Sequence, residues 1–236
     1  CFKIQVYFYL ESKPMKKISL ILFSFIFHSG VFSQAVNIDF EASSPATYST
    51  SNAVSGWTIS SQTATCTNSN SWTPGSPEFS ILATPIISVP YVGTISGSPL
   101  GGNNVARLNY TSANSSRTKL AQTFSVNSTN AVLCCAFATV LEGNNSHICC
   151  EATSYSFLFK DQAGNVMSCY TFSSSANPGC MPVGMTYTST QGASWINWLV
   201  KYFDLSPFLN SIITLEVIST DCVNSDHFGT LFFDAQ

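Results

Sequence analysis

Short stretches in which apolar and polar residues alternate recur along the chain, and this pattern restricts the fold more than any other feature. Alternate residues of a β-strand face the same side, so each stretch predicts a strand with one apolar face. Clusters of Gly, Asn, Ser or Pro separate the stretches and supply turns. The predicted strands are 36–41, 105–110, 119–126, 132–140, 154–160, 166–172, 198–203, 212–219 and 228–234.

Two segments depart from this pattern. Residues 194–203 could be a helix or a strand, and we favour a turn that leads into a strand. Residues 84–103 contain three prolines and several glycines, which predicts a long surface excursion of the kind that often binds ligands. Many short strands in one unit of about 200 residues predict an all-β fold, a two-sheet antiparallel jelly-roll sandwich.

The N-terminal region has the pattern of a secretory signal peptide at residues 15–34. Met15, Lys16 and Lys17 precede the apolar run Ile18–Phe27, and small residues follow near Ser33. The run is shorter than the roughly 20 apolar residues needed to cross a bilayer, so we expect export and no membrane span in the mature chain. We expect residues 1–14 to be an upstream non-native extension. Residues 35–236 are expected to form a C-terminally truncated binding module of a secreted or cell-surface protein.

The charge content argues against a nucleic-acid partner. Only 9% of the residues are charged, and Lys and Arg number 9 against 12 Asp and Glu. Binding to phosphates needs a concentration of basic side chains, which this composition does not supply. A surface rich in Ser, Thr and Asn is instead expected.

Cysteines are numerous, and in an exported chain they favour disulfides over metal sites. Cys169 and Cys180 bracket a short loop and are the pair that we predict, although sequence does not give the connectivity. The doublets Cys134-Cys135 and Cys149-Cys150, with His147 nearby, could hold zinc. Adjacent doublets do not have the Cys-x₂₋₄-Cys spacing of structural zinc sites, so we favour disulfides there too.

No catalytic motif is present in the sequence. It has no Gly-x-Ser-x-Gly element of α/β-hydrolases and no phosphate-binding glycine loop followed by lysine. The carboxylates are scattered, and sequence alone does not pair any two for glycoside hydrolysis. We therefore predict a non-catalytic protein.

Aromatic residues outside the clearest strands are candidates for ligand contact. Sugars are bound by aromatic faces together with amide and hydroxyl groups, and little charge is needed. Trp72 follows an Asn/Ser-rich loop, Tyr91 lies in the 84–103 excursion, and Trp195 lies in the ambiguous segment. These three are predicted to bind the ligand, whereas Trp57, beside a strand start, is predicted to belong to the core.

Several motifs together resemble a known family. Residues 38–41 (IDFE) are followed by Gly56-Trp57, and Asp221-Cys222 is followed by HFG at 227–229 and LFFDA at 231–235. The chain resembles galactose-binding-like and MAM-type jelly-roll modules of bacterial type IX-secreted surface proteins, which are related to carbohydrate-binding modules. The cysteine doublets and residues 84–103 do not match that family.

The resemblance implies a structural calcium ion. In the family, an acidic residue near the first strand lies beside an aspartate of the last strand, which here are Glu41 and Asp234. On the predicted first strand, Asp39 shares the polar face with Glu41. Carboxylate oxygens suit calcium, so Glu41, Asp234 and Asp39 are the predicted metal ligands.

Two functions from different classes remain open at this point. The first is a module that binds a glycan or surface polymer. The second is a structural or adhesive spacer domain that binds a protein or no small ligand, and nothing in the sequence excludes it. An unrecognised hydrolase is a weaker third alternative.

Overall fold

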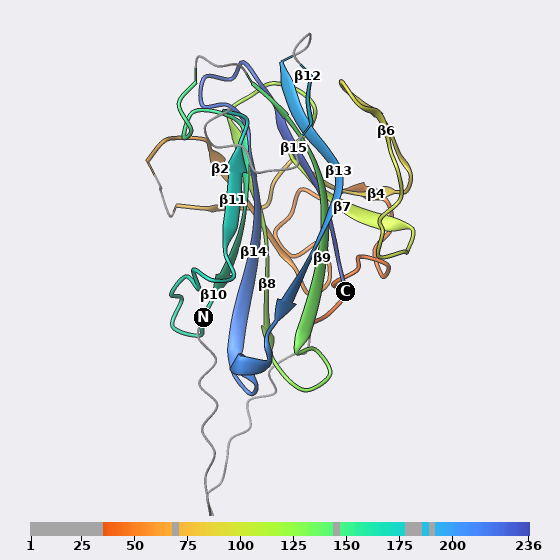
Figure 1. Cartoon of the computed structure of the whole chain (residues 1–236), viewed down its shortest axis with the longest axis vertical. Coiled ribbons are helices and arrows are strands. Elements are labelled where there is room, and N and C mark those ends of the chain that lie inside the picture. Colours follow the sequence, from red (N-terminus) through yellow and green to blue (C-terminus); the bar gives the residue numbers. More distant parts are fainter. Residues whose placement is uncertain (1–34, 68–70, 144–146, 178–185, 189–191) are drawn as a thin grey trace, which may run out of the picture. The chain divides into compact units, whose positions relative to one another are not determined.

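The computed structural model describes residues 35–236 apart from 68–70, 144–146, 178–185 and 189–191. The predicted extension and signal peptide, residues 1–34, lie outside the described residues. In the described part, regular structure is almost entirely β-strand, with a short 3-10 helix η2 at Ser206–Phe208. No helix there is long and apolar enough to span a membrane. The strands form two antiparallel layers (Figure 1), which confirms the predicted all-β sandwich.

Within the described residues, the larger layer is a seven-stranded sheet in the order β1-β4-β7-β15-β9-β13-β12. Its strands are β1 (Ala46–Thr47), β4 (Phe79–Ala83), β7 (Asn104–Leu108), β9 (Val132–Glu142), β12 (Thr186–Thr188), β13 (Ala193–Asp204) and β15 (Gly229–Ala235). The other layer is a six-stranded sheet in the order β11-β10-β14-β8-β2-β3. Its strands are β2 (Thr58–Thr63), β3 (Thr73–Pro74), β8 (Ser116–Ser125), β10 (Ser154–Lys160), β11 (Phe172–Ser175) and β14 (Ile212–Thr220).

The main core fills the space between the two sheets and is rich in aromatic rings. In β10 the side chains of Tyr155, Phe157 and Phe159 are buried, while the residues between them face outward. Phe233 of β15 contacts Phe157 edge-on, with ring centroids 5.6 Å apart. Trp57 is 2% exposed and packs here, which confirms its prediction as a core residue.

A second, smaller core lies on the outer face of the seven-stranded sheet. In β9 and β15 apolar residues occupy both faces. The outward-facing side chains of Val140 and Phe232 must therefore be buried by another part of the chain. The hairpin of β5 (Ile86–Val89) and β6 (Gly93–Ile95) covers them. Residues 84–103, predicted as a surface excursion, therefore contain a hairpin whose side chains Ile86, Val89 and Ile95 are buried.

Three strand predictions differ from the structure. Residues 36–41 form turns, because Asn37 and Phe40 adopt positive φ values of 49° and 61°. This conformation places the Phe40 ring in the core, stacked on Trp57 at 5.3 Å. Residues 166–171 contain an isolated bridge at Val166 and a turn before β11. Residues 193–204 form one strand, β13, so all of residues 194–203 belong to a strand.

Candidate functional site

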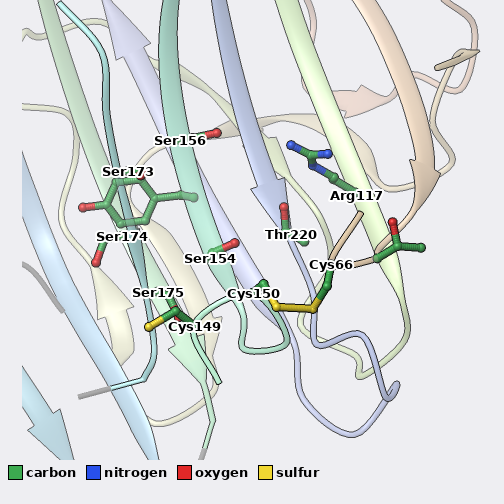
Figure 2. Close-up of a pocket in the computed structure, with 12 residues that line it drawn as sticks. Cys66, Arg117, Cys149, Cys150, Ser154, Ser156, Ser173, Ser174, Ser175 and Thr220 are labelled. Carbon is green, nitrogen blue, oxygen red and sulfur yellow. A yellow bond between two sulfur atoms is a disulfide. The ribbon is translucent and has the colours of Figure 1, made fainter. Parts of the chain in front are cut away.

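An open cavity of about 390 Å³ lies at one end of the six-stranded sheet, on its outer face (Figure 2). The antiparallel register aligns Ser175, Ser154, Thr220 and Arg117 across β11, β10, β14 and β8. Since the alternation of β10 turns Tyr155 inward, Ser154 faces the cavity. Further hydroxyl groups come from Thr65, Ser156, Ser173 and Ser174. The cavity is thus lined mainly by small hydroxyl side chains and one guanidinium group.

Trp72 lies next to this cavity, against the cations of β8. The guanidinium carbon of Arg117 is 5.0 Å from the centre of the Trp72 ring, and the Lys119 ammonium is 4.3 Å from it. Such contacts are attractive because cations favour the negative face of an aromatic ring. Arg117 also lines the cavity, so it connects the half-buried Trp72 to the hydroxyl groups.

One carboxylate on the same face of the sheet lies between two lysines. Glu216 of β14 is 3.5 Å from the Lys119 ammonium and 2.9 Å from that of Lys160. Burial lowers the pKa of Lys119, and the negative charge of Glu216 opposes that effect. Burial likewise lowers the pKa of Arg117. The face is therefore polar, and the single carboxylate of Glu216 offsets only part of the positive charge of Arg117, Lys119 and Lys160.

The other two predicted ligand residues lie on the opposite layer. Tyr91 stacks parallel to Phe228, with ring centroids 6.0 Å apart, and its hydroxyl group donates to Glu142. That hydrogen bond raises the pKa of Tyr91 to about 12. Trp195 packs against the smaller core, and its indole N–H is buried with no hydrogen-bond partner in the part of the chain described. The structure thus separates Tyr91 and Trp195 from Trp72, and contact of the three with a ligand stays a prediction.

The predicted metal ligands Asp39, Glu41 and Asp234 line one cavity of about 330 Å³. The carboxylate of Glu41 accepts hydrogen bonds from the backbone N–H groups of Asn103 and Asn104, both at 2.8 Å. Gly102 permits this approach, since a Cβ atom there would lie 2.6 Å from the Glu41 oxygen. Although residues 36–41 are not a strand, the structure brings the three carboxylates together.

Asp234 has an unusual environment for a carboxylate. It is 2% exposed, and the Ser98 hydroxyl donates a hydrogen bond to it. Burial is the main reason that its pKa rises to about 7, and the charges of Asp39 and Glu41 raise it further. A buried acid near two other acids is costly to ionise unless a cation accompanies it.

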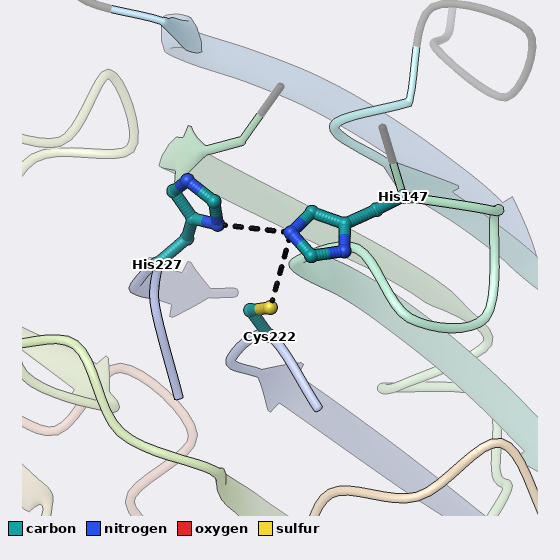
Figure 3. Close-up of side chains that lie close together, drawn as sticks. All are labelled: His147, Cys222 and His227. Atoms are coloured by element: carbon teal, nitrogen blue, oxygen red, sulfur yellow. Dashed lines mark hydrogen bonds between the residues drawn. The ribbon is translucent and has the colours of Figure 1, made fainter. Parts of the chain in front are cut away.

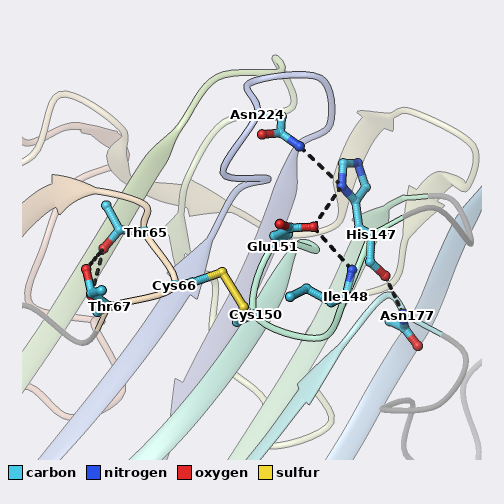
Figure 4. Close-up of a disulfide and its surroundings, with 9 residues drawn as sticks. All are labelled: Thr65, Cys66, Thr67, His147, Ile148, Cys150, Glu151, Asn177 and Asn224. Carbon is cyan, nitrogen blue, oxygen red and sulfur yellow. Dashed lines mark hydrogen bonds and ion pairs between the residues drawn. A yellow bond between two sulfur atoms is a disulfide. The ribbon is translucent and has the colours of Figure 1, made fainter.

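A disulfide between Cys66 and Cys150 borders the hydroxyl-lined cavity (Figure 4). It joins the segment after β2 to the loop between β9 and β10. The predicted partner of Cys169, Cys180, lies outside the described residues, so that pair stays a prediction.

A third group of polar side chains lies close together in the structure, although the sequence did not predict it. His147, Cys222 and His227 place their nitrogen and sulfur atoms within 4.8 Å of one another. The sequence signal that could have found it is the Cys-x₄-His spacing of Cys222 and His227 within one loop.

Comparison with known proteins gives structural similarity only. No family model matches the chain, and no curated protein matches it. TmCBM61 in complex with β-1,4-galactotriose matches with a TM-score of 0.43 and 11% identity over 86% of this chain and 98% of that chain. The enzymatically active domain of bacteriophage CBA120 tailspike protein 4 matches with a TM-score of 0.38 and 11% identity, over 86% of this chain and 21% of that chain. The family 11 carbohydrate-binding module of the Clostridium thermocellum cellulase Lic26A-Cel5E matches with a TM-score of 0.30 and 8% identity, over 81% and 91%. At these identities the similarity concerns the fold alone.

Proposed function

We propose that residues 35–236 form a non-catalytic carbohydrate-binding module of a secreted or cell-surface protein. The observation that carries this proposal is the hydroxyl-lined cavity on the six-stranded sheet, with Arg117 and Trp72 beside it. Sugar hydroxyls pair with hydroxyl and guanidinium groups, and an aromatic ring can cover a sugar face. The signal-peptide pattern of residues 15–34 supports export.

The size and chemistry of the cavity both suit binding. Its volume of about 390 Å³ falls within the range of roughly 300–1,000 Å³ typical of small-ligand sites. Its polar groups are neutral hydroxyls and one cation, which can bind a sugar without cleaving it. Glycoside hydrolysis would need a pair of carboxylates facing one glycosidic bond.

A glycan array followed by calorimetric titration of the full chain tests this function. We expect a saccharide to bind, and Trp72→Ala to weaken its binding about tenfold through loss of the aromatic contact. Arg117→Gln, which keeps hydrogen-bond donors but removes the charge, should weaken it less. Trp198→Phe is the matched control, because the indole N–H of Trp198 donates to Ser96 on the other layer at 2.9 Å.

Two outcomes would overturn this assignment in different ways. If no saccharide binds, the proposed carbohydrate function is wrong, and the alternative function of a structural or adhesive spacer domain is favoured. If Tyr91→Phe or Trp195→Phe abolishes binding while Trp72→Ala does not, the function stands but the site lies on the seven-stranded sheet.

We also propose that Asp39, Glu41 and Asp234 hold a structural calcium ion. Three carboxylates around one cavity offer the hard oxygen donors that calcium prefers. The ion would compensate the negative charge that burial makes costly at Asp234. The residues present therefore fit the ion that the family resemblance implies.

A calcium titration followed by thermal melting tests this proposal. With calcium at about 100 times its Kd, binding should stabilise the folded chain by about 2.7 kcal/mol. Glu41→Gln should remove most of the gain, because it keeps an oxygen for the backbone N–H groups but loses the charge. Asp226→Asn, a change at an exposed acid, is the control. No calcium-dependent shift in the melting temperature would disprove the site.

A further inference from the structure

Two histidines and a cysteine converge between two loops of the sandwich (Figure 3). His147 lies in the loop between β9 and β10, and Cys222 and His227 lie in the loop between β14 and β15. The Nε2 atom of His147 is 3.2 Å from Nδ1 of His227 and 3.5 Å from Sγ of Cys222. Cys222 is fully buried and His147 is 7% exposed. Residues far apart in sequence thus direct three potential metal donors to one point.

We propose that Nε2 of His147, Sγ of Cys222 and Nδ1 of His227 bind a divalent transition-metal ion of the zinc type. Zinc takes tetrahedral ligands at about 2.0–2.1 Å for nitrogen and about 2.3 Å for sulfur. Those lengths require about 3.3 Å between two nitrogen ligands and about 3.6 Å between nitrogen and sulfur. The observed 3.2 Å and 3.5 Å match the two edges that meet at His147, and the third edge, between Cys222 and His227, is within 4.8 Å.

The donor chemistry selects the kind of ion. Imidazole nitrogen and thiolate sulfur suit zinc and related transition metals, whereas calcium prefers oxygen. Three protein ligands leave the fourth tetrahedral position to water or another small ligand. Cys222 carries a free thiol, so its sulfur is available as a metal ligand.

The loops that carry the ligands are held together by backbone contacts. The N–H of Cys222 donates to the carbonyl of His227 at 3.1 Å, which closes the second loop on itself. The N–H of Val223 donates to the carbonyl of Glu151 at 3.0 Å, which ties the two loops together. The Cys66–Cys150 disulfide anchors the first loop close to His147 (Figure 4). Such contacts around the ligands reduce the ordering cost of binding an ion.

A second layer of contacts supports the proposed ligands. The Nδ1 atom of His147 lies 4.0 Å from the Glu151 carboxylate, an acceptor for a proton on that nitrogen. A histidine that binds metal through one nitrogen commonly has a carboxylate or carbonyl near the other. The backbone N–H of Asn224 donates to the Cys222 sulfur at 3.4 Å, which helps to fix the position of that sulfur.

Zinc and cobalt binding to the full chain, produced without a histidine tag, tests the proposal. We expect one tightly bound zinc ion per chain in competition with a chelating dye. Cobalt in place of zinc should give a thiolate-to-metal charge-transfer band and the visible bands of a tetrahedral ion. Cys222→Ser should abolish the charge-transfer band and weaken zinc binding more than about 100-fold, beyond the roughly 10–100-fold effect of losing an outer partner.

Controls separate this site from a folding defect. Cys134→Ser changes another buried free thiol, on β9 away from the cluster, and should leave both ions unaffected. If Cys222→Ser does not fold, the cobalt spectrum of the unmodified chain still reports a thiolate ligand. His227→Gln, at the less buried ligand, gives a second test of affinity.

Three results would overturn the proposal: no stoichiometric zinc, a cobalt spectrum without a thiolate band, or unchanged zinc affinity in Cys222→Ser. Any of them would leave the cluster as a hydrogen-bonded His–Cys–His network. Saccharide binding is measured separately, so failure here would not affect the proposed carbohydrate function.

Discussion

The two ends of strand β15 carry polar clusters of opposite chemical character. Asp234 is near the end of the strand, in the cavity that Asp39 and Glu41 also line. His227 lies just before its start, beside Cys222 and His147. At about 3.3 Å per residue, roughly 23 Å of extended chain separates His227 from Asp234. One strand thus connects a cluster of oxygen donors with a cluster of nitrogen and sulfur donors.

The clusters also differ in how the chain gathers them. The carboxylates come from the first described turns and the last strand, and the backbone N–H groups of Asn103 and Asn104 hold Glu41 in place. The histidines and the cysteine come from two neighbouring loops that a backbone hydrogen bond joins, with a disulfide close by. The first cluster depends on the closure of the whole fold, and the second on local loop structure.

The largest expected effect concerns the buried carboxylate of Asp234. Its pKa is about 7 in the folded chain against an ordinary 3.8. Between those values the folded state keeps a proton that the unfolded state has lost, so stability should fall as pH rises from about 4 to about 7. The loss is at most about 4 kcal/mol. Urea unfolding in the presence of a calcium chelator would measure it.

Two comparisons isolate the contribution of Asp234. Asp234→Asn should flatten the pH dependence, and added calcium should do the same in the unmodified chain because the ion stabilises the carboxylate form. Some slope should remain, since burial also raises the pKa of Asp221 to about 8. A slope that is identical in Asp234→Asn and in the unmodified chain would contradict the prediction.

A crossed test of ions and variants should show that the clusters act independently. Cys222→Ser should weaken zinc more than about 100-fold, about 2.7 kcal/mol, and leave the effect of calcium unchanged. Glu41→Gln should remove the effect of calcium and leave zinc unchanged. Sites this far apart with no shared partner usually behave additively. Calorimetric titration of both ions into both variants measures whether the two sites are independent. If either variant lost the binding of both ions, independence would be contradicted.

The sequence predicted the layers of the fold because strand alternation is a local signal. Residues 154–160 show it in full, and they form β10 over the same range. The same rule failed for residues 36–41, where alternation is present but Phe40 turns into the core in a left-handed conformation. For residues 84–103 the error was the opposite one, because strands form where the sequence predicted a surface loop. The prolines and glycines of this segment predict loops, and only the apolar outer face of β9 and β15 explains why a hairpin packs there.

The sites were predictable to different degrees. The three carboxylates were grouped through a family resemblance, and they do line one cavity. The hydroxyl-lined cavity was not predicted, because serines on four strands become neighbours only through the sheet register. The approach of His147 to Cys222 depends on two loops about 75 residues apart, and no sequence period encodes such a contact.

The smallest expected effect is at the outer partner of the nitrogen–sulfur cluster. Glu151 is partly exposed and lies 4.0 Å from Nδ1 of His147. Glu151→Gln keeps the size of the side chain but removes the charge that would stabilise a protonated Nδ1 while Nε2 binds metal. Zinc affinity should fall about tenfold, near 1.4 kcal/mol, with the cobalt charge-transfer band retained. Calcium stabilisation should not change, because this carboxylate is not among the residues that line the Asp234 cavity. If Glu151→Gln abolished the thiolate band, Glu151 would be holding the loop rather than tuning the ligand, and the cluster would depend on its surroundings as fully as the carboxylate cluster does.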